Sequence, residues 1–161
     1  MTEFAFLSQH VNSLPKTIQK EYILKSGKTG SQIRSFELRA NIEVPEELKQ
    51  FYEFSYGAKL REYEILTIAE IAKLLPELRK IYADFWTRGS VVPFAYVAGV
   101  GDYVAFDIEQ ASADGLLILD CFHEFPPAQW KGICFGLKTW LTKMAENGFQ
   151  PFWLKERHDK S

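Results

Sequence analysis

The chain has 161 residues, of which 47% are hydrophobic and 25% are charged, and its formal net charge is −2. This length and composition are typical of one folded domain and exclude a largely disordered chain. A pI near 6.0 gives no support to binding of nucleic acid or of an anionic membrane, because both need clustered positive charge.

The two cysteines and the N-terminus give no sign of a zinc site, a disulfide framework or export. Cys121 and Cys134 lie in no CxxC or zinc-ligand spacing, so we expect buried, reduced thiols. The apolar run at residues 4–7 is too short for a signal peptide or a membrane span. We therefore expect a cytoplasmic protein.

The first third of the chain predicts helices. We expect a short helix or an extended lead-in over residues 4–14, and a strand or weak helix over residues 18–28. Ser31 is suited to cap a helix that runs through Ala40. Pro45 suits the first position of an amphipathic helix, because its missing N–H would have no partner there, and Gly57 is suited to end that helix.

The next stretch predicts a short strand at residues 63–66, followed by helices. Thr67 and Glu70 have the spacing of a capping box, in which each side chain satisfies the backbone N–H of the other residue. A helix is expected to start at Ile68 and to run to about Leu75. Pro76 is expected to begin a second helix, since proline is favoured in a first turn.

Three short apolar runs, bounded by glycines, predict an antiparallel meander over about residues 92–122. The turn glycines Gly99 and Gly101 are expected to adopt positive φ. A last short strand over residues 130–135 and a helix over residues 136–147 follow, and Phe149, Phe152 and Trp153 are expected to fold back on the core. Residues 155–161 are all polar, so we expect a frayed tail.

Together these elements predict an α+β fold in one domain over residues 1–161. An antiparallel sheet carries the central meander, with helices packed mainly on one face. If Val104 and Phe106 point to those helices, then the alternate residues of the same strand point to the opposite, polar face. That face would carry an acidic strip able to bind a basic protein, although a merely solvated sheet face explains the same pattern. The expected partner-binding residues are Asp102, Tyr103, Asp107, Glu109, Asp120 and Glu124. Trp153 is a further candidate for an interface anchor.

No catalytic motif stands out in the sequence. Gly27-Lys28-Thr29 resembles the end of a P-loop, but Tyr22 stands where the first glycine of that motif belongs. We expect no catalytic residue, no metal and no cofactor. One enzymatic alternative stays open: a small metal-dependent hydrolase that uses clustered acids and an imidazole. Its candidate ligands are Asp102, Asp107, Asp120, His123 and Glu124.

The order of four motifs resembles the SUKH superfamily, which includes the fungal Smi/Knr cell-wall-synthesis regulators and many bacterial immunity proteins. The motifs are VPEELKQFYEFSYG at residues 44–57, ILTIAEI at 65–71, GDYVAFD at 101–107 and GLKTWL at 136–141. The resemblance covers roughly residues 30–147. Tyr56-Gly57 replaces the usual Asn-Gly pair of the family, and Gly136-Leu137 replaces Ser-Phe.

The resemblance implies an antiparallel sheet with helices and a binding role without catalysis. It implies an immunity protein that neutralises a cognate toxin, such as a nuclease-like effector, through the acidic sheet face. A regulatory scaffold like the fungal members is the other binding role that the family allows. Neither role requires nucleic acid or a membrane as partner, and neither fixes the oligomeric state.

Overall fold

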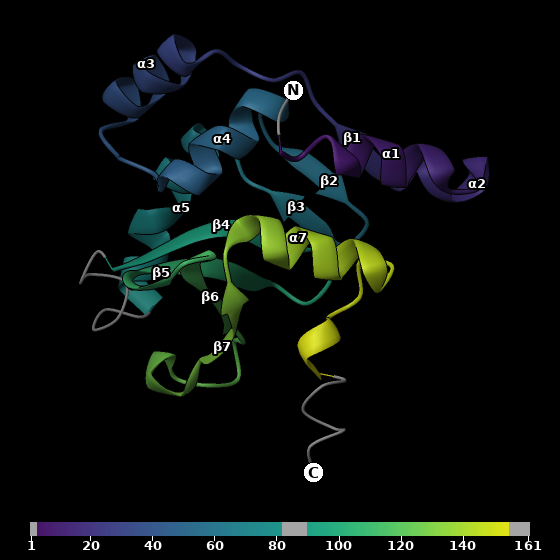
Figure 1. The fold of residues 1–161 in the computed structure, drawn as a ribbon. Coiled ribbons are helices and arrows are strands. Elements are labelled where there is room, and N and C mark those ends of the chain that lie inside the picture. The colour runs from purple at the N-terminus through teal and green to yellow at the C-terminus, as the bar shows by residue number, and fades with distance from the viewer. Residues whose placement is uncertain (1–2, 82–89, 155–161) are drawn as a thin grey trace.

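The structure, a computed structural model, describes residues 3–81 and 90–154. Its centre is a seven-stranded antiparallel sheet in which every strand pairs with its neighbour in the sequence, in the order β1 to β7 (Figure 1). The strands are β1 (Tyr22–Leu24), β2 (Ala58–Leu60), β3 (Tyr63–Ile65), β4 (Val91–Val97), β5 (Asp102–Ser112), β6 (Gly115–Cys121) and β7 (Lys131–Phe135). The predicted central meander is therefore confirmed as β4–β5–β6.

Helices surround this sheet, which confirms the predicted α+β class. They are α1 (Phe6–Ser13), α2 (Lys16–Gln19), α3 (Gly30–Ala40), α4 (Glu46–Phe54), α5 (Ile68–Ile81), the short 3-10 helix η1 (Pro127–Gln129) and α7 (Leu137–Glu146). The stretch expected to be a strand or weak helix contains both α2 and β1. The tail expected to fray, residues 155–161, lies outside the described residues.

Two helix boundaries differ from the sequence prediction. Thr29, and not Ser31, caps α3: its hydroxyl accepts from the N–H of Gln32 at 3.2 Å, and the Gln32 side chain accepts from the N–H of Thr29 at 2.9 Å. Ser31 is already inside the helix. A reciprocal pair satisfies two N–H groups that the first turn leaves unpaired, so it outcompetes a single serine cap.

Helix α5 begins as predicted but does not break at Pro76. The Thr67–Glu70 capping box is present, with hydrogen bonds of 3.0 and 3.2 Å. The helix then continues through Pro76, which costs it one backbone hydrogen bond. Leu75 and Leu78 are buried on either side of the proline, and this burial holds one continuous helix in place.

One face of the sheet packs against α7, which lies in front of the strands in Figure 1. Trp140 of α7 is fully buried, and its ring meets those of Phe94 at 5.4 Å and Tyr63 at 5.7 Å edge-on. Aromatic side chains bury the largest apolar areas, and edge-on pairs favour this packing further. This contact makes α7 part of the core.

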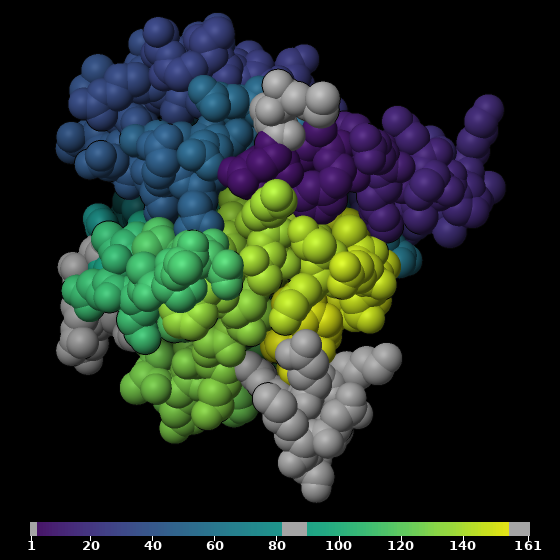
Figure 2. All heavy atoms as spheres, in the orientation of Figure 1, coloured from purple at the N-terminus to yellow at the C-terminus, as the bar shows by residue number. Residues whose placement is uncertain are grey.

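Phe149, which follows α7, packs against the N-terminal part of the chain. Figure 2 shows the N-terminal helices next to the C-terminal segment. The ring of His10 in α1 lies 6.0 Å from that of Phe149, and Tyr22 of β1 lies 5.7 Å from it. Phe149, Phe152 and Trp153 are all buried, so the prediction that they fold back on the core is confirmed.

Candidate functional site

The predicted acidic strip on one open sheet face is wrong. Val104 pairs with Asp120 and Tyr103 with Cys121, so Asp120 shares the face of Val104 while Tyr103 lies on the other. Asp102 and Asp107 are only 7% and 9% exposed. Helices cover parts of both faces, and the six predicted residues therefore do not form one surface.

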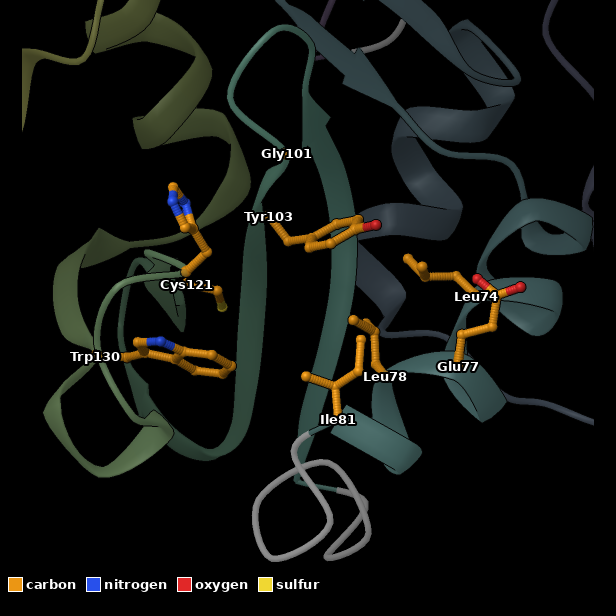
Figure 3. A pocket seen from close by; sticks show the side chains of 9 residues that line it. Leu74, Glu77, Leu78, Ile81, Gly101, Tyr103, Cys121 and Trp130 are labelled. Atoms are coloured by element: carbon orange, nitrogen blue, oxygen red, sulfur yellow. The ribbon is translucent and has the colours of Figure 1, made fainter.

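Tyr103, expected to anchor a partner, lies between the sheet and α5. It is half-buried and its ring packs against Tyr96 at 5.4 Å. Together with Leu74 and Leu78 of α5 it lines a small hollow, and Figure 3 shows its ring turned toward the side chains of this helix. The alternation of the strand was read correctly, but α5 occupies the side that was expected to face solvent.

Asp107 shapes the backbone. Its Oδ1 accepts from the N–H of Glu109 at 3.1 Å, and its Oδ2 accepts from the side-chain amide of Gln110 at 2.8 Å. The strand register shifts here, between Asp107 and Ala111, so the carboxylate stabilises a β-bulge. Glu109 is exposed on this bulge. Asp102 begins β5, whereas Glu109 lies toward the other end of the strand.

Asp102 and Asp120 instead line a groove of about 690 Å³ between the β4–β5 turn, the end of β6 and the C-terminal segment. We call it the C-terminal groove. Three of its apolar side chains are unusually exposed: Val100 at 55%, Leu154 at 46% and Phe125 at 43%. Its lining residues are Glu62, Tyr63, Val97, Ala98, Gly99, Val100, Asp102, Val104, Asp120, Phe122, Phe125, Phe149, Gln150, Pro151, Trp153 and Leu154.

The β4–β5 turn forms one wall of the groove. Gly99 and Gly101 have φ of +89° and +77°, as predicted, and this left-handed backbone is open to glycine without strain. Between them the turn presents Val100 to solvent at the groove.

Asp102 links the start of β5 to the loop that follows β6. Its Oδ1 accepts from the backbone N–H of His123 at 2.9 Å and lies 2.6 Å from the Nδ1 of the same residue. The hydrogen bond to Asp102 raises the pKa of His123. Both interactions fall on Oδ1, which leaves Oδ2 without a hydrogen bond from the residues that the structure describes.

Asp120 links the sheet to the C-terminal segment, since its Oδ2 accepts from the indole N–H of Trp153 at 2.9 Å. Glu62 adds an exposed carboxylate to the lining. Burial raises the pKa of Tyr63, and the charges of Asp120, Asp102 and Glu62 raise it further, because they oppose a phenolate. The groove therefore combines apolar walls with three carboxylates.

The geometry gives no basis for the metal-dependent hydrolase. Within residues 3–81 and 90–154, no three His, Cys, Asp or Glu side chains lie close enough to hold one ion. Asp107 belongs to the bulge, and Asp102 is engaged with His123. Cys121 is buried, as predicted, whereas Cys134 is only partly buried. Burial raises the pKa of the Cys121 thiol well above the ordinary value, which disfavours the nucleophilic thiolate.

The sequence reading missed most of the apolar half of the groove. Phe149, Pro151 and Leu154 follow the last long helix, where no periodic pattern marks a binding surface. Trp153, singled out as a candidate anchor, does line the groove, although its indole N–H is bound to Asp120. Glu124 is exposed in the loop between the lining residues Phe122 and Phe125.

Comparison with known proteins gives one family match. The family described as SMI1 / KNR4 (SUKH-1) matches residues 27–143, from the loop before α3 into α7. The groove residues from Glu62 to Phe125 lie within this match, whereas its C-terminal wall lies beyond it. No curated protein matches the chain. None of the described helices is long and apolar enough to cross a membrane.

Proposed function

The chain belongs to the SMI1 / KNR4 family (SUKH-1), and from this premise we propose that it is a non-catalytic protein-binding module that uses the C-terminal groove. The observation that carries the proposal is the exposure of Val100, Phe125 and Leu154 around one groove. Apolar side chains scattered singly are normal on a surface, but a contiguous apolar patch marks an interaction site.

The finer proposal is an immunity protein that neutralises a cognate toxin domain, such as a nuclease-like effector. Nuclease clefts are basic because they hold a polyanion, and an acidic surface complements them, speeds encounter and sets specificity. The groove offers an exposed carboxylate at Glu62, and the less exposed carboxylates of Asp102 and Asp120 lie in its lining. A regulatory scaffold like the fungal family members would differ in its partner and not in its binding chemistry.

The proposed interface keeps part of the set expected from the sequence. Asp102 and Asp120 line the groove, and the exposed Glu124 lies on the adjoining loop. The proposed interface does not include Tyr103 or Asp107, because Tyr103 lies against α5 and Asp107 holds the β-bulge. It does not include Glu109 either, because Glu109 lies toward the end of β5 that is far from Asp102.

The experiment is co-expression with the effector domains encoded beside its gene, with growth protection and complex formation by size-exclusion chromatography as readouts. We expect wild type to protect and to co-elute with a basic effector. Leu154→Gln should weaken both, whereas Ile108→Gln should not, because Ile108 is equally exposed at 46% but lies outside the groove. Failure of wild type to protect against, or to bind, any of these domains would overturn the immunity function.

A further inference from the structure

The lining of the C-terminal groove is unbalanced in charge. Among the residues that the structure places in its walls are three carboxylates, and none of those residues is a lysine, arginine or histidine. Two described basic side chains close to the lining are already paired: His123 with Asp102, and Arg61 with the carbonyl of Gly148 at 3.1 Å. Any occupant of the groove therefore meets a negative, mostly apolar surface.

Asp102 decides which occupants the groove can accept. Its side chain is already largely buried, and Oδ2 is the oxygen that accepts no hydrogen bond from the described residues. If an apolar partner covered the groove, Oδ2 of this carboxylate would lose its remaining water without gaining a donor, which is unfavourable. An anionic partner would add repulsion from Glu62 and Asp120 as well.

A cationic side chain removes this penalty. A lysine or arginine donates a charge-assisted hydrogen bond to a carboxylate, and such bonds are the strongest of their kind in proteins. Its aliphatic stem can lie along apolar walls while its charged end reaches the acid. The exposed side chains of Val100, Phe125 and Leu154 would then contact apolar residues on both sides of the cation.

We propose that the C-terminal groove receives an apolar segment of a partner protein that carries a lysine or arginine, with the cation on Asp102 and Glu62. This assignment rests on the protein-binding function proposed above and names the chemistry of the segment that is bound. The apolar walls supply affinity, and the acids select for a basic residue at one position.

The test uses a phage-displayed library of random dodecapeptides, panned against the full chain. We expect the enriched peptides to combine large apolar residues with lysine or arginine. For the tightest peptide, fluorescence polarisation should show about a tenfold loss of affinity when its basic residue is replaced by glutamine. Glu62→Gln and Val100→Gln should each weaken binding, and added salt should weaken it in wild type.

Matched controls separate groove binding from general adhesion. Glu53→Gln removes an exposed carboxylate from α4, outside the groove, and Ile108→Gln removes an exposed apolar side chain from β5; neither should change the affinity. Thermal unfolding of every variant verifies that it is folded.

Several results would overturn the inference. They are the absence of enriched peptides, enrichment of peptides without a basic residue, and equal binding by the groove variants and wild type. Binding only after deletion of residues 155–161 would also overturn it, because the chain's own end would then occupy the groove. A further outcome is an effector that binds the variants Glu62→Gln, Val100→Gln and Leu154→Gln as tightly as it binds wild type. That result would retain the protein-binding function and overturn the groove as its site.

Discussion

Glu47, in the first turn of α4, caps the first turn of α7: its Oε1 accepts from the backbone N–H of Leu137 at 2.8 Å. Its Oε2 accepts from the N–H of Leu116 at 2.9 Å, at the start of β6. One carboxylate thereby joins three elements that are distant in the sequence. It also places negative charge at the N-terminus of α7, where the helix dipole favours it.

Glu47→Ala should destabilise the fold by about 1–3 kcal/mol, because two partly buried N–H groups lose their acceptor. Glu47→Gln should cost less, since its amide oxygen can still accept from one of them. Urea unfolding measures both effects. Glu46→Ala is the control: the Glu46 side chain is exposed, and its ion pair with Lys49 is 4.0 Å long. Equal losses for Glu46→Ala and Glu47→Ala would contradict the proposed cap.

Gly136→Ala should be among the most damaging single changes in the sheet region. Gly136 has φ of +93°, and an added Cβ would collide with the carbonyl oxygen of Asp114. Gly101→Ala tests backbone strain alone, because its φ is +77° and a Cβ there would meet no atom within 4 Å. We expect a loss of about 1–2 kcal/mol for Gly101→Ala and a larger loss for Gly136→Ala. Calorimetry of thermal unfolding measures both losses. A larger loss for Gly101→Ala than for Gly136→Ala would refute the prediction.

The pair of His123 and Asp102 predicts a pH dependence of stability. The pKa of His123 is raised above its ordinary value of 6.5 by the hydrogen bond to Asp102, so the folded state binds the proton more tightly than the unfolded state does. The resulting stabilisation is fully present below the unfolded pKa and is lost as the pH rises through the higher folded pKa.

Wild type should therefore lose more stability than His123→Gln between about pH 6 and about pH 8. Thermal unfolding across this range measures the difference, and NMR titration of the His123 ring measures the pKa directly. Parallel stability curves for the two proteins, or a His123 pKa below 6.5, would show that the hydrogen bond does not favour the protonated ring.

Glu37 of α3 is a buried carboxylate whose charge is balanced by α4. Its Oε2 accepts from the N–H of Val44 at 2.9 Å, and its Oε1 lies 3.5 Å from the Nζ of Lys49. Lys49→Met should destabilise the fold by about 1–2 kcal/mol, a value below that of a fully buried pair because Arg34 also lies 3.8 Å from the carboxylate.

Combining Lys49→Met with Glu37→Gln should cost less than the sum of the two single losses, since the uncompensated charge is then absent. Denaturant unfolding of the four proteins gives this coupling. Strict additivity would mean that Lys49 stabilises the helix pair by packing and not by charge.

Local patterns predicted much of the fold. The capping box at Thr67 and the burial of Trp140 on one side of α7 depend on residues three or four positions apart, and this spacing is visible in the chain itself. The glycine-bounded meander was equally clear. The strand Ala58–Leu60 was missed, because three residues carry no periodicity and exist as a strand only through pairing with β1 and β3.

The binding surface was less accessible from the sequence. Alternation along β5 correctly placed Tyr103 and Val104 on opposite faces, but it gave no information on what covers either face. The docking of α5 covers Tyr103, and the hydrogen bonds of Asp107 commit it to a bulge. The wall formed by Phe149 and Leu154 depends on contacts between distant parts of the chain, among them Trp153 with Asp120 and Phe149 with Tyr22.

The sequence by itself determined the family, the α+β class and the helices, because hydrogen bonds within a helix and turns within a meander connect near neighbours. Only the tertiary structure decided which acids are exposed and where an apolar groove opens. Both depend on contacts between elements tens of residues apart, such as α5 against β5 and the C-terminal segment against β6. Solvent exposure follows from these contacts, and a strand pattern alone does not encode it.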